Sequence, residues 1–278
     1  MSTYILSPSD TTSDMPQRTF DIPHLDVRQP FEWLRQGWDD LRAAPVVSLI
    51  YGLVVAALAF LFAYLTAAVD RFYLVPFLFS GFLIIAPFLS VGLMAMAKRR
   101  DEHQRPHTVS VTRILVGNAP SLTMMGLFLL LVFINWIMLS NLMFGGIFQE
   151  VLPTYQQVRP LPVMFLESLP FLAVFGGIAI ILAAIVFRMT ALSLPMLLDQ
   201  KIDAFNATFA SWRAVGENWR AMSVWALLIA ALVSIATATF FLGLIVVIPW
   251  LGYASWHAYR DSLIPRAPSP TGGDTAQA

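Results

Sequence analysis

The chain contains no cysteine and little charge. Among its 278 residues there is no cysteine, which excludes disulfide bonds, thiolate zinc and iron–sulfur sites, the haem-attachment motif and a cysteine nucleophile. Charged residues make up 12% of the chain and hydrophobic residues 58%. A soluble domain has about 25% charged and about 45–50% hydrophobic residues. The mean hydropathy is +0.69. This composition predicts an integral membrane protein.

Net charge and motif content exclude further classes of function. Seventeen basic and 17 acidic residues give a net charge of zero, so we expect no attraction to nucleic acid and take the lipid bilayer as the first partner. The sequence has no glycine-rich phosphate loop, no HExxH or GxSxG motif and no pair of carboxylates inside an apolar stretch. We therefore expect a protein that is not an enzyme and that has no cofactor and no metal site.

Long uncharged stretches predict six membrane-spanning helices. A helix needs roughly 20 apolar residues to cross the hydrocarbon core. The stretch from Ala221 to Tyr259 has 39 uncharged residues, too many for one crossing, so we divide it near Phe241 to Gly243; an unbroken helix would give five spans. The predicted spans are 45–69, 72–97, 121–144, 168–187, 222–241 and 243–259.

The basic residues predict the orientation of these spans. Fifteen of the 17 lysines and arginines fall in the two terminal segments and the two long connections, and only Arg71 and Arg159 fall on the opposite side. The positive-inside rule then places both termini in the cytoplasm. With five spans, 13 basic residues would lie on one side of the membrane and 4 on the other, a weaker asymmetry than 15 against 2. Residues 1–30 show no cleavable signal peptide. We expect a multi-pass protein of a bacterial inner (cytoplasmic) membrane.

The expected fold is all-α, a polytopic transmembrane helical bundle of six spans arranged as three hairpins with amphipathic interfacial helices. The membrane domain covers residues 30–263, and the polar segments 1–29 and 264–278 are predicted to be disordered cytoplasmic tails. A match between Arg113–Asn118, before the third span, and Arg213–Asn218, before the fifth, indicates an internal repeat. We interpret it as a unit of interfacial helix plus hairpin that occurs three times.

Two segments that precede spans have apolar residues at helical spacing. These residues are Phe31, Leu34, Trp38 and Leu41 in the first segment and Phe205, Phe209, Trp212 and Trp219 in the second. The pattern is typical of helices that lie in the membrane interface with their aromatic rings toward the acyl chains. Docking of a partner protein is the alternative.

Seven residues are candidates for contacts with a cavity or a partner: Asn135, Asn141, Arg188, Thr237, His257, Trp38 and Trp212. Amides and hydroxyls inside spans form hydrogen bonds between helices or line a polar cavity, here in the outer half of the bundle. Arg188 either extends to the cytoplasmic interface or lies within the fourth span, where it needs a partner. Of the four histidines, only His257 lies at the end of a span, and an interfacial role is favoured over a ligand role.

Three segments, Trp33–Leu41 (WLRQGWDDL), Ser193–Asp199 (SLPMLLD) and Ser255–Arg260 (SWHAYR), resemble a bacterial family of predicted six-span integral membrane proteins of unknown function. The resemblance covers roughly residues 30–263, and some members carry the label cytochrome c oxidase subunit I. It implies a topology and an inner-membrane location but no site residues. A haem–copper catalytic subunit needs more histidine ligands within its spans than the four histidines of this chain provide.

Two functions remain open from the sequence. The first is a non-enzymatic accessory, scaffold or assembly protein of a membrane complex, a respiratory one included, with other membrane-protein subunits as partners. The alternative is a small-molecule or lipid transporter with a polar cavity in the outer half of the bundle. All 17 acidic residues lie outside the predicted spans or at their edges, which disfavours a proton-coupled pump. The sequence does not indicate an oligomeric state.

Overall fold

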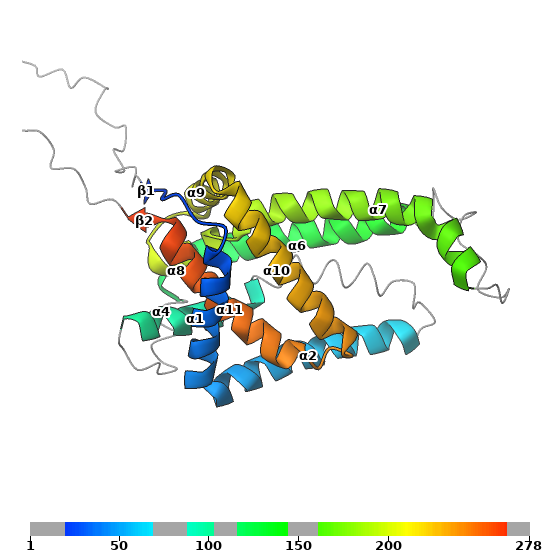
Figure 1. Cartoon of the computed structure of the whole chain (residues 1–278), viewed down its shortest axis with the longest axis horizontal. Helices are drawn as coiled ribbons and strands as arrows, with labels where there is room; N and C mark the ends of the chain where they lie inside the picture. Colours follow the sequence, from blue (N-terminus) through cyan, green and yellow to red (C-terminus); the bar gives the residue numbers. More distant parts are fainter. Residues whose placement is uncertain (1–19, 69–87, 103–115, 144–160, 266–278) are drawn as a thin grey trace, which may run out of the picture.

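The computed structural model describes residues 20–68, 88–102, 116–143 and 161–265. Within these ranges the protein is helical apart from one pair of two-residue strands (Figure 1). The elements are β1 Phe20–Asp21, α1 Gln29–Ala43, α2 Pro45–Ala68, α4 Val91–Asp101, α6 Ala119–Leu142, α7 Leu161–Thr190, α8 Ser193–Asp199, α9 Ala204–Glu217, α10 Trp219–Ala238, α11 Leu244–Ser262 and β2 Ile264–Pro265. Most of the predicted second span and of both predicted tails lies outside the described residues.

Within the described ranges, four stretches of helix are long and apolar enough to cross a membrane: Pro45–Leu65, Ala119–Leu142, Ala173–Asp199 and Trp219–Ala238. Only about a quarter of each is buried inside the protein, and large apolar side chains such as Phe60 and Met138 are exposed along them. A helix that satisfies its own backbone hydrogen bonds and presents apolar side chains outward is suited to lipid. The chain is a multi-pass integral membrane protein.

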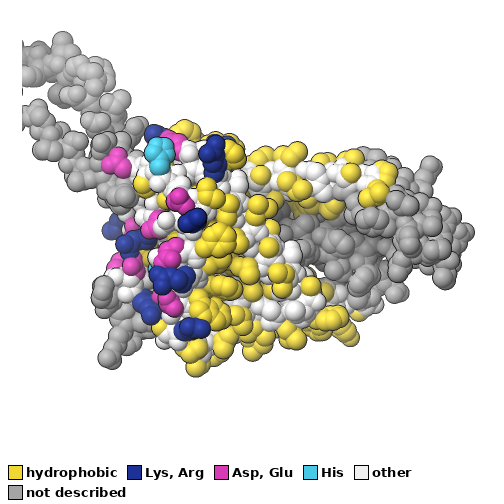
Figure 2. All heavy atoms as spheres, viewed as in Figure 1, with side chains coloured by type: hydrophobic (Ala, Val, Ile, Leu, Met, Phe, Trp, Pro, Cys, Tyr) yellow, Lys and Arg dark blue, Asp and Glu magenta, His cyan; other side chains and the backbone are white. Residues whose placement is uncertain are grey.

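The charged side chains that the structure describes gather at one end of the molecule. Figure 2 shows Lys, Arg, Asp and Glu at the end that carries α1, α4, α8, α9 and the strands in Figure 1, and a mainly hydrophobic surface beyond it. We call this part the charged end. There β1 pairs with β2 in antiparallel register, Phe20 with Pro265 and Asp21 with Ile264. Both ends of the described chain therefore lie on the same side of the apolar surface.

The uncharged stretch from Ala221 to Tyr259 contains two helices. α10 ends at Ala238 and α11 begins at Leu244. In the turn between them, Phe240 and Phe241 have φ angles of 54° and 68°, a left-handed conformation that costs an L-residue about 1–2 kcal/mol. The hydroxyl of Thr239 accepts the backbone N–H of Gly243 at 2.9 Å. The chain reverses in this turn, and α11 returns to the charged end (Figure 1).

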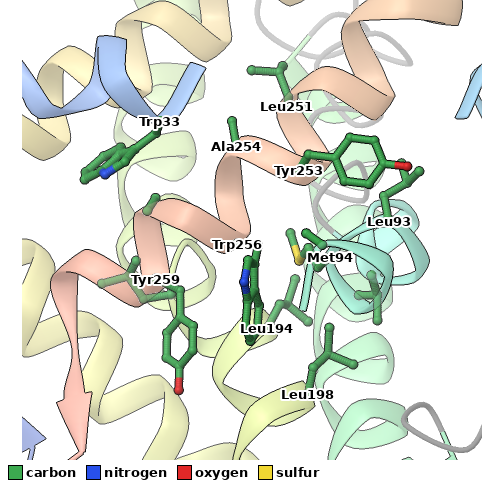
Figure 3. Packing of buried hydrophobic residues seen from close by; sticks show 14 of the residues in the cluster. Trp33, Leu93, Met94, Leu194, Leu198, Leu251, Tyr253, Ala254, Trp256 and Tyr259 are labelled. Carbon is green, nitrogen blue, oxygen red and sulfur yellow. The ribbon is translucent and has the colours of Figure 1, made fainter. Parts of the chain in front are cut away.

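α11 is the centre of the main hydrophobic core. It packs against α1, α2, α4, α8 and α10, and its Tyr253, Trp256 and Tyr259 are almost fully buried. Figure 3 shows Tyr253 beside Leu93 and Trp256 beside Leu194, so α4, α8 and α11 meet at one place. This packing fixes the positions of the polar side chains at the charged end.

The apolar face of α1 is covered by protein and not by lipid. Leu34 and Leu41 are buried, and Trp38 meets Trp250 of α11 edge to face at 5.1 Å. Leu34 and Leu41 therefore face protein and not the acyl chains, which corrects the prediction for these two residues, and α11 partly covers the ring of Trp38. The helices approach so closely at Gly37 that an added Cβ would lie 2.7 Å from the backbone nitrogen of Ala254. Only Phe31 of the predicted face is exposed.

α9 differs from α1 because its aromatic face remains open. Small residues on its other side, among them Ala207 and Ala214, are buried, and α9 packs through this side against α7 and α8. Phe205 and Phe209 are 73% and 66% exposed. An interfacial position remains the prediction for this helix.

Candidate functional site

The three candidates inside predicted spans are each hydrogen-bonded to their own helix. The side-chain amides of Asn135 and Asn141 donate to the carbonyl oxygens of Leu131 and Ile137, both at 2.8 Å. The hydroxyl of Thr237 donates in the same way to the carbonyl four residues earlier, at 2.8 Å. Both asparagines are exposed and Thr237 is half-buried. In the described part of the chain, no contact brings these three side chains together.

Arg188 and Trp212 do form one site, between the end of α7 and α9. The Arg188 Nε donates to the backbone carbonyl of Trp212 at 3.0 Å, and its Cζ lies 4.3 Å from the centre of the Trp212 ring. A cation over the face of a tryptophan is attracted by the ring quadrupole. The backbone below is held by Ser211, whose hydroxyl donates to the Arg188 carbonyl at 3.0 Å and accepts the N–H of Leu192 at 3.2 Å.

His257 is a partner of an aspartate in a link between three helices. Its Nε2 lies 2.8 Å from Oδ2 of Asp40 on α1, and since an ionised carboxylate only accepts, the imidazole donates. The other oxygen of Asp40 lies 3.1 Å from Nε of Arg100 on α4. Arg100 also donates to the carbonyl of Asp39 at 3.3 Å. His257 thus joins α11 to α1 and α4.

Sequence reasoning missed a second link, the Lys98–Asp199–Tyr259 triad. Lys98 Nζ of α4 lies 2.8 Å from Oδ1 of Asp199 at the end of α8. The Tyr259 hydroxyl of α11 donates to Oδ2 of Asp199 at 2.9 Å. Each of three helices therefore contributes one member. Lys98 directly follows the predicted span 72–97 and Asp199 lies in the connection after the span 168–187. Solvated side chains are expected at both places, and no pattern in the sequence indicates that they meet.

A third link was also missed and ties α1 to the end of α11. The buried Trp33 donates its indole N–H to Oδ2 of Asp261 at 2.8 Å, and Gln29 donates to the same oxygen at 2.7 Å. Trp33 stands edge to face with Trp225 of α10 at 5.7 Å. The sequence pattern placed Trp38 on the face expected to meet the acyl chains and did not include Trp33, whose ring is the more completely enclosed of the two.

Asn118 and Asn218, which are equivalent in the predicted repeat, each bind a loop that precedes an interfacial segment, and Asn118 also donates to the carbonyl of Leu197 at 3.0 Å. Each precedes a membrane helix, α6 or α10. The amide of Asn118 donates to the carbonyl of Ile202, in the loop before α9, at 3.1 Å. The amide of Asn218 donates to Pro23 at 2.9 Å and accepts the N–H of Leu25 at 2.8 Å, in the loop before α1. In both cases an asparagine fixes the loop that leads into another unit's interfacial segment, which favours the repeat.

Across the described ranges, no group of three or more His, Asp and Glu side chains is placed to hold a metal ion. A family model described as predicted integral membrane protein (DUF2189) matches residues 74–199, a range that includes α4, α6, α7 and α8. No curated protein and no solved structure matches the chain. Over those residues the chain is similar to a family of predicted integral membrane proteins, in agreement with the four long apolar stretches of helix that the described residues contain.

Proposed function

We propose that this protein is a non-enzymatic accessory or scaffold subunit of a membrane-protein complex. The observation that carries the proposal is that all seven candidate residues are engaged within the chain. The three polar residues of the spans bond to their own helices, and the four at the charged end pair with each other or with neighbouring helices. Polar groups used in this way stabilise a structure rather than surround a substrate.

The proposed topology has six spans, both termini in the cytoplasm and a bacterial inner membrane around them. The pairing of β1 with β2 supports an even number of crossings between residues 20 and 265. Four stretches of the described chain are long and apolar enough to cross a membrane. We propose α11 and the segment 72–97 as the other two spans. α11 has 19 residues, which is about 28 Å of helix. The concentration of basic residues at the charged end favours its cytoplasmic position.

The outer face of α6 is the surface that we propose for docking, and a membrane helix of another protein is its occupant. Asn135 is exposed there, beside Leu131 and Met138, which are 59% and 67% exposed. A carboxamide that faces lipid costs free energy, and a neighbouring helix can offset that cost through a hydrogen bond. The carbonyl oxygen of the Asn135 side chain is the acceptor available for it.

Co-purification from the native membrane tests this proposal. A tagged full-length chain is purified in mild detergent and the accompanying proteins are quantified by mass spectrometry. We expect Asn135→Leu to reduce recovery of the stoichiometric partner by about threefold to tenfold, the range of one interhelical polar contact. Thr237→Val is the matched control, because Thr237 is half-buried on α10 and bonds to its own helix. Equal recovery with Asn135→Leu and the wild type contradicts docking at α6.

The same variants distinguish the transporter alternative. A transporter with a polar cavity lined by Asn135 and Thr237 loses flux in both Asn135→Leu and Thr237→Val. It also retains a small molecule or lipid, but no stoichiometric protein, through purification. Loss of flux in both variants would replace the accessory function by transport.

A further inference from the structure

We propose that Arg188, Trp212 and Gly216 form a binding site for the phosphate of an anionic phospholipid head group. The site lies where α7 meets α9, and the proposal does not depend on the accessory function. No contact within the described residues pairs Arg188 with an acidic side chain, although other charged groups at this end are paired. Arg213, for example, forms an ion pair with Glu217 at 2.7 Å.

The guanidinium of Arg188 is fixed but not neutralised. Its Nε donates to the carbonyl of Trp212 at 3.0 Å, and its Cζ lies 4.3 Å from the centre of the Trp212 ring. Among the described residues, neither terminal nitrogen has a hydrogen-bond acceptor. Two N–H groups on one rigid fork match two oxygens of a phosphate. Little side-chain entropy is left to lose on binding because the group is already held.

Gly216 makes room for this arrangement. An added Cβ at Gly216 would lie 3.2 Å from Cζ of Arg188 and closer still to one terminal nitrogen. The φ of Gly216 lies outside the left-handed region, so backbone conformation does not require glycine here. The missing side chain therefore serves the close approach of the guanidinium, which lies against α9 because residue 216 is a glycine.

The depth of the site selects a lipid as the source of the phosphate. Arg188 lies inside the apolar stretch Ala173–Asp199. The neighbouring α9 carries exposed Phe205 and Phe209, and exposed Trp219 begins α10. Figure 2 shows basic side chains at the border between the charged end and the apolar surface. Tryptophan and arginine at this level mark the head-group region, and basic pockets between membrane helices bind anionic head groups.

Native mass spectrometry of the full-length protein tests the site. The protein in neutral detergent is titrated with an equimolar mixture of dioleoyl phosphatidylglycerol and dioleoyl phosphatidylcholine. We expect preferential retention of the first phosphatidylglycerol molecule, and about tenfold weaker retention in Arg188→Gln, as for the loss of one charge-assisted contact. Gly216→Ala, which keeps the charge but displaces it, gives a similar loss. Arg213→Gln is the control for net charge on α9 and retains the lipid as the wild type does.

The outcomes separate the site from general electrostatic attraction. Equal losses in Arg188→Gln and Arg213→Gln would overturn the proposal, since only total charge would then matter. Equal retention of the two lipids by the wild type would also overturn it. Displacement of the lipid by millimolar inorganic phosphate would assign the site to a free anion instead. The melting temperature of each variant in detergent is measured as a control for folding. Arg188→Lys keeps the charge but lacks the paired N–H groups of a guanidinium, and we expect its affinity for phosphatidylglycerol to lie between those of the wild type and Arg188→Gln.

Discussion

Gly52 of α2 is the position where one methyl group should change the packing of the bundle most. An added Cβ would lie 2.7 Å from the carbonyl carbon of Ile245 on α11 and nearer to its oxygen, while ordinary contacts begin at 3.4 Å. The obstacle is backbone, which cannot rotate away. Gly52→Ala must therefore move the helices apart by more than 0.7 Å, because the carbonyl carbon alone has to go from 2.7 to 3.4 Å and the oxygen is nearer still. The 2.6 Å hydrogen bond between Ser48 and Tyr253 would lengthen with them.

The expected change in stability follows from two opposing effects. Overpacking costs about 1–3 kcal/mol, here toward the upper end, and alanine gains about 1 kcal/mol over glycine within a helix. A net loss of about 2 kcal/mol lowers the melting temperature by about 4–8 °C in a chain of this size. Gly177→Ala in α7 is the matched control, because its added Cβ meets nothing within 4 Å, and it is neutral or stabilising.

Thermal unfolding in mild detergent, followed by circular dichroism at 222 nm, measures both glycine variants. If Gly52→Ala melts at or above the temperature of Gly177→Ala, the close approach of α2 and α11 is refuted. A lower melting temperature for Gly52→Ala alone supports it.

Two further predictions concern the charged end. Lys98→Met leaves Asp199 with its hydrogen bond from Tyr259 but without its cation. Because the Lys98 and Asp199 side chains are only 13% and 24% exposed, we expect the free energy of unfolding to fall by about 2 kcal/mol. A melting temperature equal to that of the wild type would contradict the triad. Asp203 accepts the N–H of Asn206 at 2.9 Å as the N-cap of α9, and this backbone hydrogen bond lowers the pKa of Asp203. Its stabilisation is present above the unfolded pKa of about 3.9 and is lost as the pH falls through the lower folded value. Asp203→Ala therefore costs about 1 kcal/mol near pH 7 and less below about pH 4, in melting curves recorded across that range; a constant difference would exclude the cap.

The membrane class and the approximate bounds of the long helices could be predicted from the sequence, because apolar length is a local property. The helices Ala119–Leu142 and Trp219–Ala238 lie within three residues of the spans 121–144 and 222–241. The surroundings of α1 could not be predicted. Its pattern shows which side is apolar, and a lipid surface and a protein surface demand the same pattern.

The polar contacts at the charged end were beyond sequence reasoning for a physical reason. Asp40 and His257 are 217 residues apart, and neither one's local sequence specifies the other as its partner. Asn118 and Asn218 did carry a signal, since they end the repeated segment. The sequence repeat identified these two asparagines as equivalent, but it did not show that their side-chain amides bind loops of other repeat units.

The position of α1 against α11 has a consequence for the order of events during synthesis. α1 ends at Ala43 and its main neighbour begins at Leu244, so at 5–20 residues per second a ribosome needs about 10–40 s to supply the missing surface. During that interval the side of α1 that carries Leu34 and Leu41 has no protein to cover it. An amphipathic helix in this state rests on the nearest apolar boundary, the surface of the membrane. The sequence pattern of an interfacial helix would then match the position of α1 on the membrane surface during synthesis, and the structure shows its position against α11 after folding.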